Sequence, residues 1–327
     1  MLITATDKGL YCAAGDFYID PWQPVPRAVL THAHGDHARW GSEQYFAEAS
    51  SEGVLRQRLG AQMPLIPKQY GESFELGDTV VSLHSAGHVL GSAQVRVRVG
   101  DETWIVTGDY KRAPDPTCKP FEPVTCDVLI SEATFALPCY RWPDTKDVVN
   151  EIWRWWQANR EQGGASVLFC YAFGKAQRVL AELLAHTQES VYLHGAVTAL
   201  VEEYRRAGVA MLPTEPVVRE KRADYKGALV IAPPSAAGTP WMRRFGDAST
   251  GFCSGWMRIR GARRRRGYDR GFVLSDHADW PALIETIKES RAKKVLLTHG
   301  YSDALVRYLC EQGIDAGALR TAYGEEE

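Results

Sequence analysis

The segment from 30 to 40, LTHAHGDHARW, constrains this chain more than any other part of it. Four ligand-type side chains follow the apolar stretch RAVL there: His32, His34, Asp36 and His37. The first two alternate and can point to one side of an extended loop, whereas the last two can face a second point nearby. Two adjacent pockets of nitrogen and oxygen ligands suit a pair of divalent cations such as zinc or manganese. The segment therefore predicts a two-metal site, and a solvated polar turn is the alternative interpretation.

Further ligands must come from elsewhere, because one loop cannot complete the coordination of two cations. Three candidates lie beside apolar, strand-like runs: His88 in SAGHVLGS, Asp109 in TGDYKR and His299 in LLTHGYS. A carboxylate can bridge two metals about 3.5 to 4 Å apart, and Asp109 is the bridging candidate. Each residue alone could equally be a turn aspartate or a hydrogen-bonded histidine, so the prediction rests on their joint placement.

The composition indicates a soluble globular protein. Of 327 residues, 45% are hydrophobic and 24% are charged, which permits one large domain or two smaller ones. The formal net charge of −2 means that nucleic-acid binding would need a local basic patch. Seven scattered cysteines without a C-x-x-C pair favour a reducing compartment, and no run resembles a signal peptide or a membrane span. We therefore expect a cytoplasmic protein with no membrane partner.

Strand and helix signals divide the chain into two regions. Up to about residue 140 short strand signals alternate with turns, and AQVRVRV at 93–99 has a period of two. From about residue 145 helices and strands alternate, as in parallel α/β units. Thr145 is expected to cap a helix whose apolar face contains Val148, Val149, Ile152, Trp155 and Trp156. We expect these tryptophans in a core rather than in base stacking.

The segment YAFGKAQ at 171–177 could be mistaken for a nucleotide-binding loop because it contains Gly-Lys. Phe169 stands where such a loop needs its first glycine, and Ala176 replaces the serine or threonine that would hold magnesium. The sequence therefore predicts no nucleotide cofactor.

Six segments in order, THAHGDH, AGHVLGS, TGD, SEATF, SDHAD and LTHG, resemble the motif series of the metallo-β-lactamase-fold nucleases of the β-CASP superfamily. The likeness spans residues 20 to 300. It implies an α/β fold, an αββα sandwich of two mixed sheets interrupted by a β-CASP-like lobe. The corresponding boundaries are 1–140 for the first part of the sandwich, 141–270 for the inserted lobe and 271–327 for the return segment. YAFGKAQ also resembles a segment of that family's lobe.

The resemblance implies a role for each motif residue. One metal would be held by His32, His34 and His88, and the other by Asp36, His37 and His299, with Asp109 between them. Asp20, in FYIDP, would brace the ligand loop without binding metal. His277 would protonate the leaving oxygen, and Glu132 would orient the ring of His277. This division of roles is consistent with general acid catalysis. Asp36 is counted with these two as catalytic. Without the family, a surface carboxylate would be the preferred interpretation of Glu132.

A basic run lies shortly before His277, in WMRIRGARRRRG. Arginine binds phosphate through paired hydrogen bonds, so this run could hold a nucleic-acid strand. A solvated basic loop is an equal alternative. The candidate phosphate-binding residues are the six arginines of this run and one lysine two positions after Asp109. They are Arg258, Arg260, Arg263, Arg264, Arg265, Arg266 and Lys111.

Within the superfamily the chain most resembles the bacterial exonucleases that are associated with a DNA ligase and a helicase. The resemblance implies hydrolysis of DNA, with attack from a 5′ end favoured, and those two enzymes as partners. His299 instead matches the RNA-processing branch, so an RNA nuclease is the second hypothesis. A hydrolase of a small ester or thioester is a third, which YAFGKAQ disfavours, and a non-catalytic scaffold is disfavoured by the complete ligand set.

Overall fold

The computed structural model describes residues 1–218, 225–259 and 267–321, and the chain forms two compact units. Unit 1 combines Met1–Arg141 with His277–Glu327, and unit 2 is Trp142–Asp276. The sequence indicates an inserted region that ends at 270. Unit 2 runs on to Asp276 because β17 (Arg270–Phe272) pairs in parallel with β16 (Ser249–Cys253), a strand of the unit 2 sheet.

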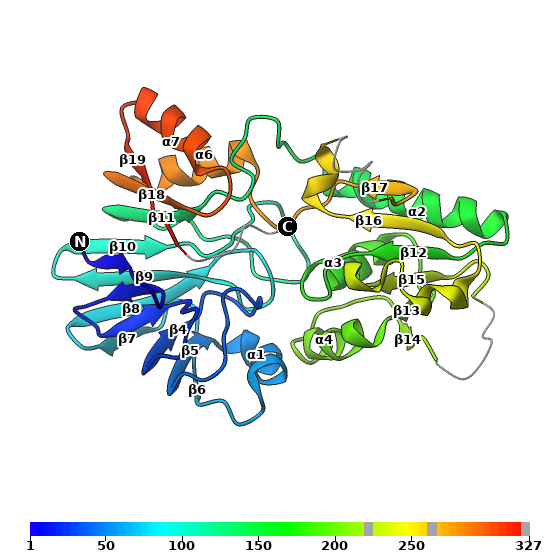
Figure 1. Ribbon diagram of the computed structural model, residues 1–327, viewed down its shortest axis with the longest axis horizontal. Helices are drawn as coiled ribbons and strands as arrows, with labels where there is room; N and C mark the ends of the chain where they lie inside the picture. The colour runs from blue at the N-terminus through cyan, green and yellow to red at the C-terminus, as the bar shows by residue number, and fades with distance from the viewer. Residues whose placement is uncertain (219–224, 260–266, 322–327) are drawn as a thin grey trace. The chain divides into compact units, whose positions relative to one another are not determined.

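Unit 1 contains two mixed sheets (Figure 1). The six-stranded sheet has the order β1 (Ile3–Ala5), β2 (Leu10–Cys12), β3 (Phe17–Ile19), β4 (Arg27–Val29), β5 (Gln44–Glu48) and β6 (Leu65–Lys68). The seven-stranded sheet has the order β19 (Asp315–Ala318), β18 (Lys294–Thr298), β11 (Val128–Glu132), β10 (Glu102–Val106), β9 (Ala93–Val99), β8 (Thr79–Ser85) and β7 (Ser73–Leu76). Both combine parallel and antiparallel pairs, as the resemblance implied.

The two sheets of unit 1 face each other across a shared apolar core. Val29 and Phe46 of the first sheet lie in one cluster with Val95 and Trp104 of the second. The opposite face of the second sheet is covered by α6 (Trp280–Ser290) and α7 (Ser302–Glu311), which bury Leu283 and Leu305 among others. The first region also contains α1 (Glu52–Leu59). The predicted metallo-β-lactamase sandwich is thereby confirmed.

Unit 2 is a parallel sheet with helices. Its six strands have the order β14 (Thr214–Pro216), β13 (Val191–Leu193), β15 (Leu229–Ala232), β12 (Ser166–Phe169), β16 and β17. The helices are α2 (Thr145–Glu161), α3 (Lys175–Glu182) and α4 (Gly195–Arg206), drawn in green in Figure 1. The strand β12 is buried along its whole length, and a separate apolar cluster forms on each face of the sheet. The α/β lobe that the sequence indicates is therefore present.

The helix α2 differs from expectation only at its start. Its predicted apolar face is buried, and the indoles of Trp155 and Trp156 donate hydrogen bonds within unit 2, which confirms their place in the core. The N-cap is Asp144 rather than Thr145, because the Asp144 carboxylate accepts a hydrogen bond from the backbone of Lys146. The hydroxyl of Thr145 instead accepts a hydrogen bond from Arg178 at 2.8 Å.

Among the described residues, no helix combines the length and the apolar composition that crossing a membrane requires.

Candidate metal centre

The loops that follow β4, β8, β10 and β18 carry the predicted ligands of unit 1. His32 lies in the loop after β4, His88 follows β8, Asp109 follows β10, and His299 directly follows β18. Gly108, at φ 56°, allows two of these loops to approach closely. A Cβ atom at this position would lie 2.5 Å from the Cβ of Thr31. Only glycine accommodates both the positive φ and this contact, so the residue before Asp109 is fixed by packing.

Asp20 contacts the predicted ligand loop at two points. Its Oδ1 accepts a hydrogen bond from the backbone N–H of Thr31 at 2.7 Å, and its Oδ2 lies 2.7 Å from Nδ1 of His37. Asp20 is buried and has a φ of 44°, a conformation that a non-glycine residue rarely adopts. A carboxylate on one ring nitrogen orients the other nitrogen of His37 toward the centre.

Three histidines and Asp109 form the first group of candidate ligands. One ligand atom from each of His32, His34, His88 and Asp109 lies within 4.8 Å of all the others. Nε2 of His88 is 3.1 Å from Nδ1 of His34, and Nε2 of His32 is 3.4 Å from Oδ2 of Asp109. Three nitrogens and one carboxylate oxygen are a donor set that suits a divalent metal such as zinc. This group could hold one cation.

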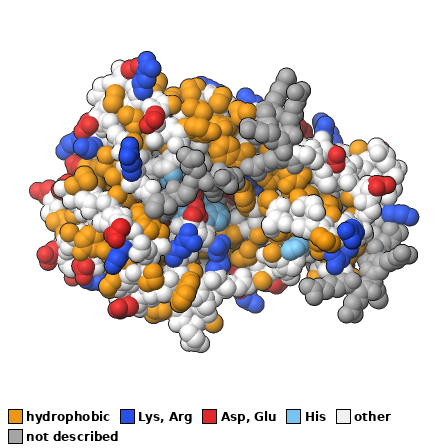
Figure 2. Space-filling model, in the orientation of Figure 1, with side chains coloured by type: hydrophobic (Ala, Val, Ile, Leu, Met, Phe, Trp, Pro, Cys, Tyr) orange, Lys and Arg blue, Asp and Glu red, His pale blue; other side chains and the backbone are white. Residues whose placement is uncertain are grey.

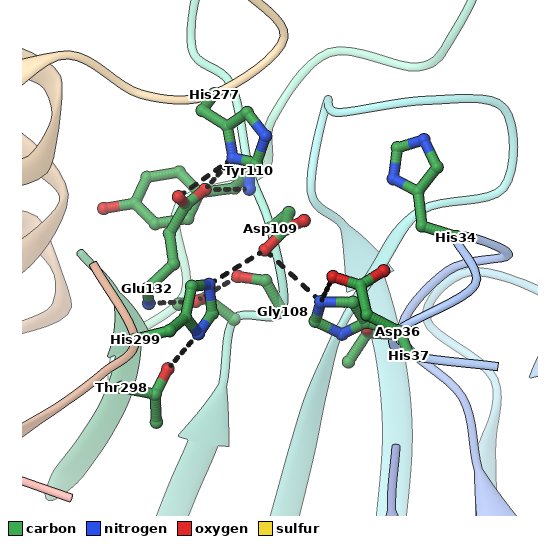
Figure 3. A network of polar contacts seen from close by, with 12 residues as sticks. His34, Asp36, His37, Gly108, Asp109, Tyr110, Glu132, His277, Thr298 and His299 are labelled. Carbon is green, nitrogen blue, oxygen red and sulfur yellow. Dashed lines mark hydrogen bonds and ion pairs between the residues drawn. The ribbon is translucent and has the colours of Figure 1, made fainter. Parts of the chain in front are cut away.

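The other carboxylate oxygen of Asp109 faces the second predicted set of ligands (Figure 3). Oδ1 lies 3.4 Å from Nε2 of His299 and 3.6 Å from Nε2 of His37. Asp36 is connected to this second set by His37, because Nε2 of His37 is 3.7 Å from Oδ2 of Asp36. Asp36 is partly exposed, at 35% of its side chain, whereas Asp109 is at 4%. The two oxygens of Asp109 thus point to two separate groups of histidines.

Two buried atoms at the centre make no hydrogen bond to the described residues. They are Nε2 of His32 and Oδ1 of Asp109. Buried polar atoms are almost always hydrogen-bonded in native proteins, because leaving one unsatisfied costs about 1 to 3 kcal/mol. One of these atoms belongs to each group, and both are of the kind that coordinates metals. The residues therefore fit a pair of bound cations.

The environment of the cluster shifts the pKa values of two of its histidines in opposite directions. Burial opposes the protonation of His37, but Asp109, Asp20 and Asp36 outweigh it and raise the pKa of His37 to about 10. Burial, reinforced by repulsion from His277 and His32, holds the pKa of His88 well below its usual range. Burial also disfavours the charged form of Asp109, yet its histidine neighbours hold its pKa well below the usual value. Without a cation, the centre is held together by charge pairs around Asp109.

Glu132 and His277 form a second polar pair beside Asp109. Nδ1 of His277 lies 3.0 Å from Oε2 of Glu132, and Oε1 of the same carboxylate accepts a hydrogen bond from the backbone of Tyr110 at 2.7 Å. Glu132 ends β11 and is buried, so the interpretation as a surface carboxylate is wrong. The ring of His277 is 4.8 Å from that of His88. Ligand atoms of Asp109, Glu132 and His277 also lie within 4.8 Å of one another.

Two threonines that the sequence analysis missed contact the rings of ligand histidines. Oγ1 of Thr31 is 3.0 Å from Nδ1 of His32, and Oγ1 of Thr298 is 3.0 Å from Nδ1 of His299. The signal was present in the sequence, since the tripeptide LTH occurs at 30–32 and again at 297–299. Thr298 is the last residue of β18, whereas Thr31 lies two residues beyond the end of β4. In both places the threonine hydroxyl can fix the orientation of the next side chain.

The predicted phosphate-binding residues differ in their burial and in whether the structure describes them. Lys111 is buried, pairs with Asp115 and donates to the carbonyl of His88 at 3.3 Å, so it is not a surface cation and the prediction is wrong for it. Arg258, at the end of a short 3-10 helix, is exposed. The other members of the basic run, Arg260, Arg263, Arg264, Arg265 and Arg266, lie outside the described residues.

Comparison with known proteins places the chain in a family. It is 32% identical over 314 residues to a probable DNA ligase of Opitutus terrae, an alignment that covers 95% of this chain and 30% of that protein. It is 29% identical over 197 residues to a ribonuclease of Thermus thermophilus, covering 52% of this chain and 45% of that protein. The chain belongs to the β-CASP superfamily of the metallo-β-lactamase fold.

This β-CASP chain spans less than half of the length of either of these curated relatives. No family model matches its sequence. Its fold is similar to a solved structure of a protein of unknown function from Enterococcus faecalis V583, with a TM-score of 0.63. That match covers 92% of this chain and 80% of the other at 13% identity, so it shows a shared fold and carries no argument about activity.

Proposed function

We propose that the chain is a two-metal phosphodiesterase that hydrolyses DNA, an exonuclease that acts in repair and favours attack from a 5′ end. The observation that carries the proposal is the position of Asp109, whose two oxygens face two groups of histidines beside the Glu132–His277 pair. In the same proposal unit 1 is the catalytic sandwich, and unit 2 is the β-CASP lobe. The seven free thiols are in keeping with a cytoplasmic location.

The chain would hold the two cations in the sets described above. One would be held by His32, His34 and His88, and the other by Asp36, His37 and His299, with Asp109 available to both. Zinc and manganese both suit these ligands. A pair of divalent cations stabilises the charge of a phosphodiester under attack and lowers the pKa of water. Asp20 orients His37, and the threonines before His32 and His299 contact the rings of those ligands.

His277 is suited to deliver a proton to the leaving oxygen. Because its Nδ1 lies against the carboxylate of Glu132, the Nδ1 hydrogen is directed to Glu132, and Nε2 is the atom from which a proton would be transferred. Glu132 is itself fixed by the backbone of Tyr110. A general acid held in this way contributes about 10²- to 10⁴-fold to such reactions.

The DNA substrate is supported by the relative from Opitutus terrae, which is named as a probable DNA ligase and contains a segment similar to nearly this whole chain. We extend the proposal to joint action with a DNA ligase and a helicase, the partners that the resemblance implies. RNA is the alternative substrate. It is favoured by the relative named a ribonuclease and by His299, which lies 3.4 Å from Asp109 and so completes the second group.

The test is a time course of hydrolysis by the full chain, stripped of metal and reloaded with manganese or zinc. The substrates are matched single-stranded DNA and RNA, labelled at the 5′ or the 3′ end. We expect early release of the labelled 5′ nucleotide from DNA, with RNA spared. Preference for RNA or internal cuts would favour the alternative, and no cleavage of either strand would contradict the proposal.

A matched pair of variants controls for contaminating nucleases. The double variant with His32→Ala and His34→Ala should lose both bound metal and hydrolysis. His84→Ala, which removes a histidine paired with Glu122 outside both ligand groups, should retain them. Hydrolysis that persists in the double variant would contradict the assignment of the site.

A further inference from the structure

One arginine lies directly on the ligand loop. Gly35 separates His34 from Asp36, and a Cβ atom at this position would be 2.7 Å from a terminal guanidinium nitrogen of Arg58, in the last turn of α1. The absence of a side chain at Gly35 therefore makes room for the positively charged head group. A cation placed here opposes the binding of divalent cations at the neighbouring ligands. Its position needs an explanation other than metal binding.

This arginine forms no close ion pair with a described carboxylate. Within the described ranges no carboxylate oxygen lies within 4.0 Å of Arg58 or of the exposed Arg39. Partial burial of the head group lowers the pKa of Arg58, as does repulsion from Arg39, whereas attraction from Asp36 raises it. Two guanidinium groups of like charge thus act on each other at the edge of the metal centre. Figure 2 shows basic side chains at the surface next to the histidines of this face.

An exposed tryptophan, Trp40, directly follows Arg39 in the sequence. The side chain of Trp40 is 77% exposed. Its segment is nevertheless anchored, because the hydroxyl of the buried Tyr45 donates to the carbonyl of Arg39 at 2.7 Å and accepts from the backbone of Ser42 at 2.8 Å. An exposed aromatic side chain next to cationic ones is the combination that single-strand binding surfaces use. Trp40 follows His37 by three residues in the sequence.

We propose that Arg58, Arg39 and Trp40 form a nucleotide subsite at the edge of the metal centre, which binds single-stranded nucleic acid. The two guanidinium groups take the phosphate next to the one that is cleaved, through charge-assisted hydrogen bonds. Trp40 stacks on an unpaired base, as aromatic side chains do in single-strand binding. The subsite rests on the proposed function, since it supplies the strand to the same metal centre.

Binding is measured separately from cleavage. The probe is a single-stranded DNA oligonucleotide with phosphorothioate linkages, which resist hydrolysis, and a fluorescein label. Its affinity for the manganese-loaded full chain is followed by fluorescence anisotropy over a range of salt concentrations, and a matched RNA probe is run in parallel. The variants are Trp40→Ala, Trp40→Phe and the double variant Arg39→Ala with Arg58→Ala. The control is Arg98→Ala, an exposed arginine on β9.

Arg98 is a suitable control because of its place in the sheet. It is paired with Thr103, near the start of β10, whereas Asp109 follows the other end of that strand. All of the substituted side chains are exposed, so the variants should keep the unfolding midpoint of the wild type. Loss of the positive charge of Arg58 should not lower the metal content, because that charge opposes cation binding. Both quantities are measured before binding is compared.

Trp40→Ala should weaken binding about tenfold, which corresponds to about 1.4 kcal/mol, and Trp40→Phe should bind within about twofold of the wild type. The double arginine variant should bind at least tenfold more weakly. Its slope of log affinity against log salt should fall by about 0.7 for each phosphate that the variant no longer neutralises. Arg98→Ala should change neither quantity.

Unchanged affinity and slope in the Trp40 and arginine variants would overturn the subsite, as would failure of the wild type to bind either probe. Cleavage of unmodified strands by the wild type tests the proposed function independently. A strand that is bound through these residues but never cut would leave the subsite standing and refute the nuclease. A strand that is cut while the variants bind normally would do the reverse.

Discussion

Two clusters of buried charge, one in each unit, are built in opposite ways. In unit 2 the carboxylate of Asp276 is satisfied on both oxygens. Oδ2 pairs with Nζ of Lys175 at 2.7 Å, and Oδ1 pairs with Arg178 at 3.2 Å. Arg178 also donates to the carbonyl of Ser275 at 2.7 Å and to Thr145. Every oxygen of the acid has a fixed partner within the chain.

In unit 1 the comparable acid is Asp109, buried among histidines. Its contacts with ring nitrogens are 3.4 to 3.7 Å long, and its Oδ1 makes no hydrogen bond to the described residues. A complete buried ion cluster holds backbone in place, whereas an incomplete one leaves donor atoms for something that the chain does not supply. The contrast distinguishes a cluster that is complete within the chain from one that is suited to hold a cation, without reference to motifs.

The two clusters meet in the sequence, since Asp276 immediately precedes His277. Within unit 2, Asp276 is held by Lys175 and Arg178, which belong to the AFGKAQR segment. This gives the segment a structural role consistent with its failure to match a nucleotide-binding loop.

Removal of Asp109 should have the largest effect. Asp109→Ala takes away the only side chain that faces both groups of histidines among the described residues, so both sites lose a ligand. We expect hydrolysis to fall about 10⁴-fold or more and bound metal to be lost. Asp315→Ala, an exposed aspartate on β19, is the control. Retention of two metals by the Asp109 variant would remove the distinction between the clusters.

Removal of the proposed general acid should lower the rate of hydrolysis without changing the metal content. His277→Ala is expected to lower kcat about 10³-fold while metal content stays at the wild-type level, because Glu132 and Asp109 remain in place. Loss of bound metal in this variant would instead make His277 a ligand, as its proximity to Asp109 also permits.

Asp276→Ala tests the other cluster. It leaves the buried side chains of Lys175 and Arg178 without their carboxylate, which should lower the free energy of unfolding by about 3 to 5 kcal/mol. Glu202→Ala removes an exposed ion pair of α4 and should leave the unfolding midpoint close to that of the wild type. Equal stability of these two variants in chemical denaturation would show that the complete cluster is not structural.

The affinity for metal should depend on pH in a defined direction. Since the pKa of His37 is raised to about 10 without a cation, its ring is protonated at neutral pH, and binding must displace that proton. Apparent affinity should therefore rise about tenfold per pH unit between pH 6 and 8, in competition titrations against a chelator. An affinity that is constant over this range would mean that His37 does not bind the cation.

The sequence was sufficient to predict which histidines and carboxylates lie together around Asp109, because they occur in short motifs that follow strands. It was insufficient wherever packing decides. Lys111 follows Asp109 as a surface cation would, yet the fold buries it against Asp115. Arg58 carried no signal, because its position over Gly35 depends on how α1 packs. Thr145 and Asp144 both suit an N-cap, and the contact to Arg178 determines which residue serves.

The most direct test of the account counts the cations. Equilibrium dialysis of the full chain against manganese, followed by elemental analysis, should give two metals per wild-type chain and a marked loss of both in Asp109→Ala. A stoichiometry of one, or two metals that persist without Asp109, would contradict a centre in which this carboxylate lies between two groups of histidines.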